Sequence, residues 1–214
     1  MRELIIDDKK CFIYEDDSDK LFMMPCDSHD LSQIENIVEL TKKDNLRYNL
    51  LAISIDKWDE QLSPWFMEPI FNGNNFKGDG DKLIDFIDKK LISEFNCSNY
   101  YLIGYSLAGL FSLYGAYHID RLSGVASVSG SLWYKDWINY ICNNKILCHK
   151  VYLSLGDLEH KSRNPVMASV LDNTDMTYEI LKNDCICLKE INPGNHFKDF
   201  DIRMAKAIKW LSMN

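Results

Sequence analysis

Short β-like runs alternate with helical stretches along most of this chain. Each strand of a parallel sheet needs a crossover, usually a helix, so such alternation is typical of a parallel sheet covered by helices on both faces. We therefore predict an α/β fold, a three-layer α/β/α sandwich with a mostly parallel sheet. A chain of 214 residues can bury one core, which predicts a single domain over residues 1–214. The strands are expected at residues 49–55, 100–104, 124–130, 150–156 and 185–191, and the helices at 32–43, 81–95, 107–118, 133–144 and 198–211.

Two segments depart from this alternation. Residues 11–14 and 21–25 are apolar runs separated by the acidic stretch 15–19, which predicts two antiparallel strands joined as a hairpin. Residues 56–80 are rich in Trp, Pro, Gly and Asn, the composition of a functional loop. We expect this loop to overhang a site.

Charge excludes some classes of partner. The 24 Lys and Arg against 32 Asp and Glu give a formal charge of −8, which repels nucleic acid and anionic membrane surfaces. Charged residues interrupt the apolar stretches near the N-terminus, so no signal peptide or spanning helix is predicted there. We expect a cytoplasmic protein without nucleic-acid or membrane partners.

The seven cysteines are an odd number without a repeating spacing, which is unsuited to a disulfide framework, and we expect them to be reduced. Cys185 and Cys187 share one face of a predicted strand. The alternative, a metal or redox pair, lacks a second Cys/His pair at zinc-site spacing. No metal site is predicted.

The segment GYSLAG, residues 104–109, lies between an apolar strand and a helix rich in small residues. A sharp strand-to-helix turn strains the serine backbone and needs small residues two positions before and after it, here Gly104 and Ala108. Ser106 would then lie at a helix N-terminus, which favours developing negative charge. The segment predicts Ser106 as a nucleophile and the Leu107 N–H as the first oxyanion-hole donor. The alternative is an N-cap serine with glycines that serve close packing.

A serine hydroxyl needs a base at neutral pH, and histidine is suited to this role. His196 lies in a Pro/Gly/Asn loop between the last predicted strand and the last helix, and it fits the chain order Ser, acid, His. We therefore predict His196 as the base. The other histidines do not reach the same edge of the sheet in that order: His29, His118, His149 and His160.

The acid that orients His196 is expected in the loop after the strand at 150–156. This loop offers Asp157 and Glu159, and either carboxylate could accept a hydrogen bond from the imidazole. A side chain usually needs a residue or two of turn beyond the strand before it can fold back. This favours Glu159, with Asp157 as the alternative.

Several longer segments carry a family resemblance. They are Trp58 with Leu62-Ser63-Pro64-Trp65, GYSLAGLFSLY (104–114), VSGSLWY (128–134), LGDLEHKSRNPVM (155–167), and NPGNHF (192–197) followed by Arg203-Met204-Ala205 and Trp210. With these segments most of the chain resembles the putative esterase family of α/β-hydrolases, which includes enterochelin esterases and, more distantly, feruloyl esterases, S-formylglutathione hydrolase and mycolyltransferases. The resemblance implies the α/β-hydrolase fold and serine esterase activity.

The resemblance also bears on individual residues. In such enzymes the acid often follows a glycine by three positions, which matches Gly156 and Glu159. A second oxyanion donor would come from the loop after residues 49–55, and the Trp58 N–H is the candidate, with a packing anchor as its alternative role. Ala108 stands where a second glycine is commoner. No cationic cluster accompanies these segments to favour an iron-chelate trianion.

The residues together predict two-step acyl transfer through Ser106, His196 and Glu159 or Asp157, without a metal or an organic cofactor. The substrate would be a small-molecule ester, and a homo-oligomer is one allowed assembly. Acyl transfer to an alcohol acceptor and a non-catalytic binding protein are the alternative functions. Six aromatic residues are expected either to wall a substrate pocket or to fill core gaps: Trp58, Trp65, Phe66, Trp133, Tyr134 and Trp137.

Overall fold

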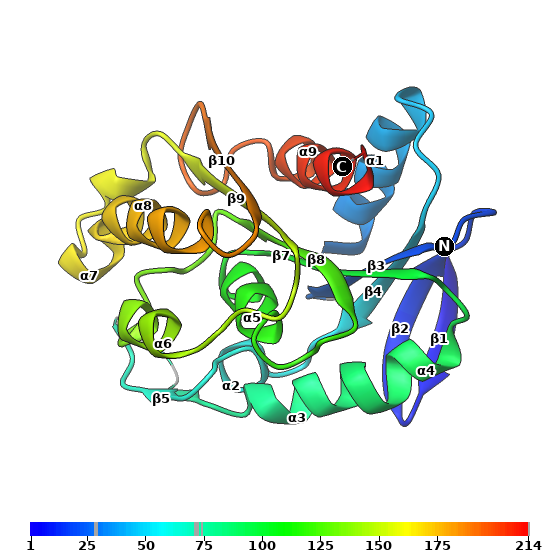
Figure 1. The fold of residues 1–214 in the computed structure, drawn as a ribbon, viewed down its shortest axis with the longest axis horizontal. Coiled ribbons are helices and arrows are strands. Elements are labelled where there is room, and N and C mark those ends of the chain that lie inside the picture. Colours follow the sequence, from blue (N-terminus) through cyan, green and yellow to red (C-terminus); the bar gives the residue numbers. More distant parts are fainter. Residues whose placement is uncertain (28–29, 71–72, 74, 214) are drawn as a thin grey trace.

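A central sheet between two layers of helices dominates the computed structural model, which describes residues 1–27, 30–70, 73 and 75–213 (Figure 1). The sheet has eight strands in the order β1-β2-β4-β3-β7-β8-β9-β10, and a separate two-stranded sheet pairs β5 with β6. All neighbours from β4 to β10 run parallel, whereas β1–β2 and β2–β4 are antiparallel. The strands are β1 (Arg2–Ile6), β2 (Lys9–Tyr14), β3 (Lys20–Cys26), β4 (Asn49–Ser54), β5 (Phe66–Met67), β6 (Phe76–Lys77), β7 (Asn99–Tyr105), β8 (Leu122–Val128), β9 (Lys150–Gly156) and β10 (Ile186–Asn192).

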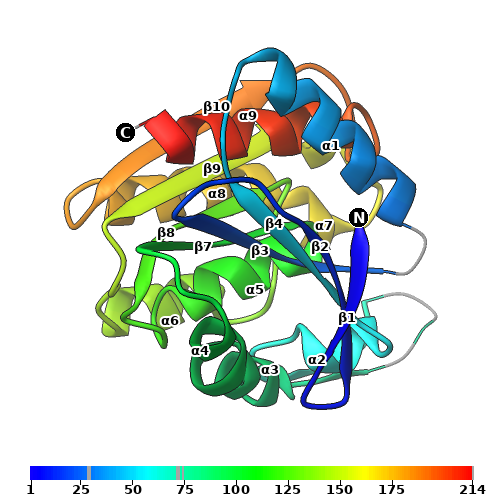
Figure 2. The same ribbon diagram turned by 90° about the vertical axis from the view of Figure 1, so that its right-hand side faces the viewer.

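Helices cover both faces of the sheet (Figure 2). The apolar core divides into two clusters, one beneath α1 and α9 and the other beneath α3, α5, α6 and α8. The predicted three-layer sandwich with a mostly parallel sheet is therefore confirmed. Within the described part of the chain, no helix has the length and hydropathy to span a membrane. The helices are α1 (Leu31–Lys43), α2 (Trp58–Gln61), α3 (Gly80–Phe86), α4 (Ile92–Glu94), α5 (Leu107–Gly115), α6 (Trp137–Asn143), α7 (Pro165–Ala168), α8 (Val170–Leu181) and α9 (Phe200–Met213).

The central strands are the part of the sequence that specifies the sheet most strongly. From Tyr101 to Tyr105 in β7 and from Val151 to Gly156 in β9, every residue is buried. A parallel strand covered on both faces has no solvent side, so its sequence is a continuous apolar run instead of an alternating one. These strands accordingly lie where the sequence predicts them, with small shifts at their ends.

The predicted hairpin between residues 11–14 and 21–25 is wrong. Strand β4 lies between the two segments: β2 pairs with it antiparallel, and β3 pairs with it parallel. Asn49 at the start of β4 holds the connecting acidic stretch, because its amide donates to the Ser18 and Lys20 carbonyls and accepts from the Asp16 N–H. The hairpin partner of β2 is β1, and Asp7 and Asp8 between them adopt the positive φ of a tight hairpin turn.

The predicted loop at residues 56–80 contains α2 and the β5–β6 pair, and residues 71, 72 and 74 of it lie outside the described residues. The helix predicted at 81–95 is present as α3, a π-helical stretch (Ile87–Leu91) and α4. Ser63 fastens the loop, since its hydroxyl donates to the Asp59 carbonyl and accepts from the Gly78 N–H. These bonds tie α2 to the segment that carries β6. Trp58, the first residue of α2, lines the same cavity as Ser106, which follows the carboxyl end of β7, and ligands bind at that edge in sheets of this kind.

Candidate active site

Ser106 occupies the sharp turn between β7 and α5. Its φ of 57° and ψ of −123° lie in a region that non-glycine residues rarely adopt, so the turn is strained. A Cβ on Gly104 would lie 2.1 Å from the Ala108 carbonyl oxygen, which explains why the turn needs glycine at that position. Backbone hydrogen bonds fix both sides of Ser106. Its N–H donates to the Val128 carbonyl, and its carbonyl accepts from the Ser131 N–H. The strain is held in place by the neighbouring strand.

His196 lies in the loop between β10 and α9, and its ring reaches the Ser106 hydroxyl. Nε2 of His196 is 3.0 Å from Oγ of Ser106. The Tyr105 hydroxyl donates to the His196 carbonyl oxygen at 2.6 Å, which ties the loop to the end of β7. A base within hydrogen-bond reach of a serine hydroxyl is the arrangement that activates such a nucleophile.

Glu159 lies on the other side of the imidazole, 2.8 Å from Nδ1 through its Oε2. Its other oxygen, Oε1, accepts hydrogen bonds from the Gly156 N–H at 2.6 Å and from the Ser129 hydroxyl at 2.7 Å. Burial would raise the pKa of this carboxyl, but the contact with His196 and the bonds from Gly156 and Ser129 outweigh it, so its pKa is below the ordinary value. Glu159 is therefore an ionised acceptor facing Nδ1.

Asp157, the alternative acid, has a different partner. Its Oδ1 accepts a hydrogen bond of 2.7 Å from the Gly194 N–H, and the Leu158 N–H donates to the Gly194 carbonyl. Asp157 is exposed and braces the turn that precedes His196. The structure thus brings Ser106, His196 and Glu159 together and places Asp157 behind them.

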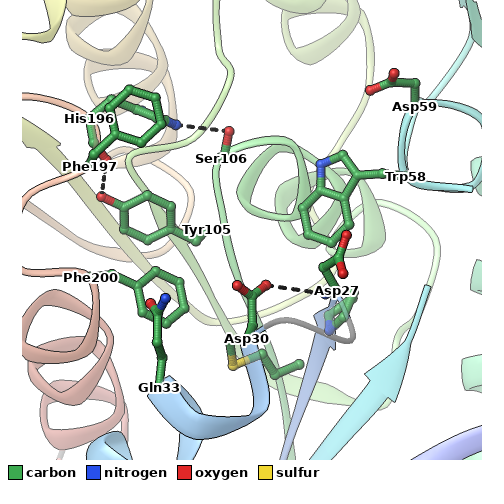
Figure 3. Close-up of a pocket in the computed structure, with 12 residues that line it drawn as sticks. Asp27, Asp30, Gln33, Trp58, Asp59, Tyr105, Ser106, His196, Phe197 and Phe200 are labelled. Atoms are coloured by element: carbon green, nitrogen blue, oxygen red, sulfur yellow. Dashed lines mark hydrogen bonds between the residues drawn. The ribbon is translucent and has the colours of Figure 1, made fainter. Parts of the chain in front are cut away.

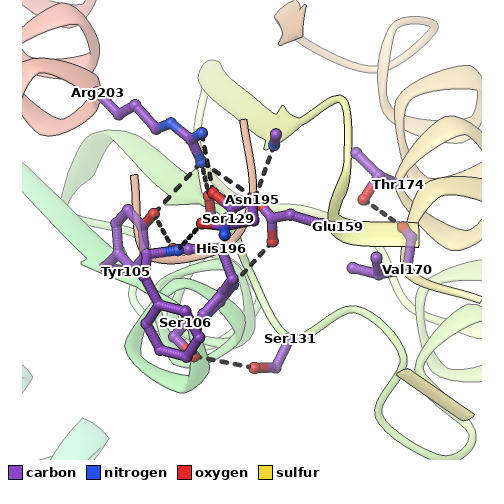
Figure 4. Close-up of polar contacts among 12 residues, drawn as sticks. Tyr105, Ser106, Ser129, Ser131, Glu159, Val170, Thr174, Asn195, His196 and Arg203 are labelled. Carbon is purple, nitrogen blue, oxygen red and sulfur yellow. Dashed lines mark hydrogen bonds and ion pairs between the residues drawn. The ribbon is translucent and has the colours of Figure 1, made fainter. Parts of the chain in front are cut away.

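Three polar side chains that the sequence did not assign to the site support these residues (Figure 4). Arg203 on α9 is 1% exposed and contacts Glu159 at 3.1 Å. Ser129 and Tyr105 complete the group through the hydrogen bonds described above. The signal for Arg203 was present in the sequence, because it interrupts an apolar stripe of the last helix that includes Met204, Ala207, Ile208 and Leu211.

The remaining histidines do not join this group. His118 lies within hydrogen-bond distance of the Tyr140 hydroxyl, with 3.0 Å between Nε2 and the oxygen. Neither it nor His149 or His160 is among the residues that line the cavity at Ser106. His29 lies outside the described residues.

A cavity of about 530 Å³ opens at Ser106. Figure 3 shows Trp58 on the opposite side of Ser106 from His196, with Tyr105, Phe197 and Phe200 on the histidine side. Among the described lining residues, the ionisable ones besides His196 and Tyr105 are Asp27, Asp30 and Asp59, and none is a Lys or Arg. The other described lining residues are Met24, Pro25 and Gln33.

Of the six aromatic residues considered for the pocket wall, Trp58 alone among the described lining residues belongs to it. Tyr134 and Trp137 are 1% exposed, and Trp65 packs against Tyr134 with their ring centroids 5.8 Å apart. Phe66 is 55% exposed on β5. The pocket interpretation is thus wrong for the other five, which are not among the described residues that line the cavity: Trp65, Phe66, Trp133, Tyr134 and Trp137.

Both proposed oxyanion donors begin helices. Leu107 is the first residue of α5, and Trp58 is the first residue of α2. Backbone N–H groups in the first turn of a helix have no carbonyl partner within that helix, so they are able to bind a developing oxyanion. The roles of Leu107 and Trp58 stay predictions.

No protein-family model matches the chain, and no curated protein matches its sequence. Solved structures do match it. An IroE-like serine hydrolase from Shewanella oneidensis superposes with a TM-score of 0.78 at 14% identity, over 95% of this chain and 75% of the other. The siderophore hydrolase EstA from Aspergillus nidulans gives 0.71 at 14% identity, over 95% and 89% of the two chains. The enterobactin esterase FES from Shigella flexneri gives 0.67 at 16% identity, over 98% and 58%. At these identities the similarity establishes the fold, and the chain has the α/β-hydrolase fold predicted from its sequence.

Proposed function

We propose that this protein is a carboxylic ester hydrolase in which Ser106 is the nucleophile, His196 the base and Glu159 the orienting acid. The observation that carries the proposal is the unbroken chain of contacts from Ser106 Oγ through both imidazole nitrogens to Glu159 Oε2. Ser106, at one end of this chain of contacts, lies in a cavity large enough for a small-molecule ester. The named activities of the structural neighbours, a serine hydrolase, a siderophore hydrolase and an esterase, support the same reaction class.

The reaction proceeds in two steps. Ser106 Oγ attacks the ester carbonyl carbon while His196 Nε2 takes the hydroxyl proton, and the imidazolium then gives that proton to the leaving alcohol. Water attacks the resulting acyl-enzyme with His196 again as the base, which releases the carboxylic acid and restores Ser106. The N–H groups of Leu107 and Trp58 stabilise the oxyanion of each tetrahedral intermediate.

The proposal is tested by reaction with a fluorophosphonate probe and by turnover of a panel of p-nitrophenyl, feruloyl and lactone esters. We expect one probe adduct, on Ser106, and hydrolysis of at least one ester class. Addition of a small alcohol shows whether the acyl group passes to an acceptor other than water. A folded protein that forms no adduct and turns over no ester would be a binding protein with a hydrolase fold.

We expect Glu159→Gln to lower kcat by about 10²-fold or more, because the uncharged amide no longer stabilises the imidazolium or fixes its tautomer. Asp157→Asn is the matched control and is expected to change kcat by less than about fivefold, since Asp157 contacts the Gly194 N–H instead of the ring. Steady-state kinetics on one p-nitrophenyl ester compare the two. A larger loss from Asp157→Asn would reverse the assignment of the acid.

The charge of the lining predicts which esters are accepted. Asp27, Asp30 and Asp59 place carboxylates around the cavity, so a carboxylate on the substrate meets like charge there. We expect kcat/KM for a p-nitrophenyl ester with a terminal carboxylate to be at least about tenfold below that of its neutral analogue, and an ammonium analogue to equal or exceed the neutral one. Added salt should reduce these differences. Preference for the carboxylate ester would contradict this expectation and would favour polyanionic chelates.

A further inference from the structure

A guanidinium group lies behind the Ser106–His196–Glu159 chain and bridges two loops (Figure 4). Nη1 of Arg203 contacts Glu159 Oε1 at 3.1 Å, the Ser129 hydroxyl at 2.9 Å and the Tyr105 hydroxyl at 3.4 Å. Nη2 donates to two backbone carbonyls of the loop that carries His196, those of Pro193 at 3.2 Å and Asn195 at 3.1 Å. A single planar group thus binds both the acid and the loop of the base.

This arrangement is costly for stability. Arg203 is 1% exposed, and its Nε has no hydrogen-bond partner among the described residues. A buried ion pair seldom stabilises a fold more than well-packed apolar residues of similar volume, and an unsatisfied N–H adds a further cost. Core packing therefore does not explain an arginine at this position, whereas the geometry of the site does.

We infer that Arg203 is a positioning residue of this site: it fixes the Glu159 carboxylate and the His196 loop at the separation that proton transfer from Ser106 requires. The inference rests on the proposed function. Because Arg203, Ser129 and Gly156 all donate to Oε1, the free oxygen Oε2 faces His196 Nδ1. The planar fork of an arginine can serve two acceptors at fixed geometry, which the single point charge of a lysine cannot do.

The position of Arg203 separates its effect on turnover from its effect on binding. Arg203 is not among the described residues that line the cavity, so it does not contact a substrate there. Small misplacements of a base or nucleophile reduce the rate of the chemical step strongly. We therefore expect Arg203→Met to lower kcat by about 10²-fold while KM stays within about threefold of wild type.

Rescue distinguishes positioning from general destabilisation. In Arg203→Ala, guanidinium ion at tens of millimolar should restore kcat by about tenfold or more, and urea at the same concentration should not, because only guanidinium replaces both the charge and the fork. The variant Arg203→Lys should retain less than half of the wild-type kcat. Lys206→Met is the matched control, since Lys206 lies one turn further along α9 and contacts Glu190 and Asn192 at 2.5 and 2.7 Å. This control is expected to keep wild-type kcat.

A double variant tests whether Arg203 acts through Glu159. If it does, the loss of kcat in the double variant Arg203→Met/Glu159→Gln should be clearly smaller than the product of the two single losses, because part of the Arg203 effect is already lost with Glu159. Losses that multiply would overturn the inference, as would wild-type kcat in folded Arg203→Lys and Arg203→Met. If Arg203→Met fails to fold, guanidinium rescue of Arg203→Ala tests the inference in its place. The proposed function fails separately, when wild-type protein forms no probe adduct on Ser106.

Discussion

Ser106→Ala is expected to reduce ester turnover by at least about 10³-fold, because it removes the oxygen that forms the acyl-enzyme. The alanine methyl group fits where the serine stood, and both residues carry a Cβ at the same positive φ. The backbone strain is therefore unchanged, and thermal unfolding should stay within a few degrees of wild type. Steady-state kinetics measure the turnover, a fluorophosphonate probe measures the loss of labelling, and circular dichroism measures thermal unfolding, all on one preparation.

Two other serines serve as controls for this variant. Ser112 on α5 donates to the Ala108 carbonyl and is buried away from the cavity, so Ser112→Ala should keep wild-type kcat. Ser131 lies closer, with its Oγ 3.5 Å from Ser106 Oγ. Adding Ser131→Ala to Ser106→Ala shows whether this second hydroxyl accounts for any residual activity. Ester turnover by Ser106→Ala at more than a tenth of the wild-type rate would remove Ser106 from the mechanism.

The parts of the fold that were predictable are those whose pattern is local. Strands β7, β8 and β9 are continuous apolar runs because helices cover both faces of the sheet. The apolar stripe of α1 likewise predicts an amphipathic helix from the local sequence alone. The pairing of β2 and β3 depended on where β4 inserts, and Asn49 makes that choice through contacts with residues about thirty positions away. The sequences of β2 and β3 alone therefore do not show which strand each of them pairs with.

The same distinction applies to the site. Ser106 was predictable because the strained turn needs small neighbours at fixed spacing, and His196 and Glu159 because chain order places their loops at one edge of the sheet. The contacts inside the site were not predictable. The sequence marks Arg203 as an arginine within an apolar stripe, but it does not show that Arg203 and Ser129, which come from separate elements, meet at Glu159. The pocket wall was hard to predict for a related reason. Composition marks the loop after β4 and the aromatic stretch after β8, but it does not say which way their side chains point, and only Trp58 among the six aromatic residues is a described lining residue.

His196→Ala is expected to lower kcat by at least about 10³-fold, comparable to the loss from Ser106→Ala, because the hydroxyl loses the base 3.0 Å away. Fluorophosphonate labelling of Ser106 should slow in parallel, since the same base activates the serine toward the probe. Added imidazole should restore part of the turnover by entering the space left by the ring. His118→Ala is the matched control, because His118 contacts the Tyr140 hydroxyl on another part of the surface.

The double variant Ser106→Ala/His196→Ala completes this prediction. When nucleophile and base act as a unit, the second substitution adds almost nothing to the loss caused by the first, whereas independent contributions multiply. We therefore expect the double variant to retain the same residual rate as either single variant. Labelling of Ser106 at wild-type speed in folded His196→Ala would show that another group activates the serine, and the 3.0 Å contact would then have no catalytic meaning.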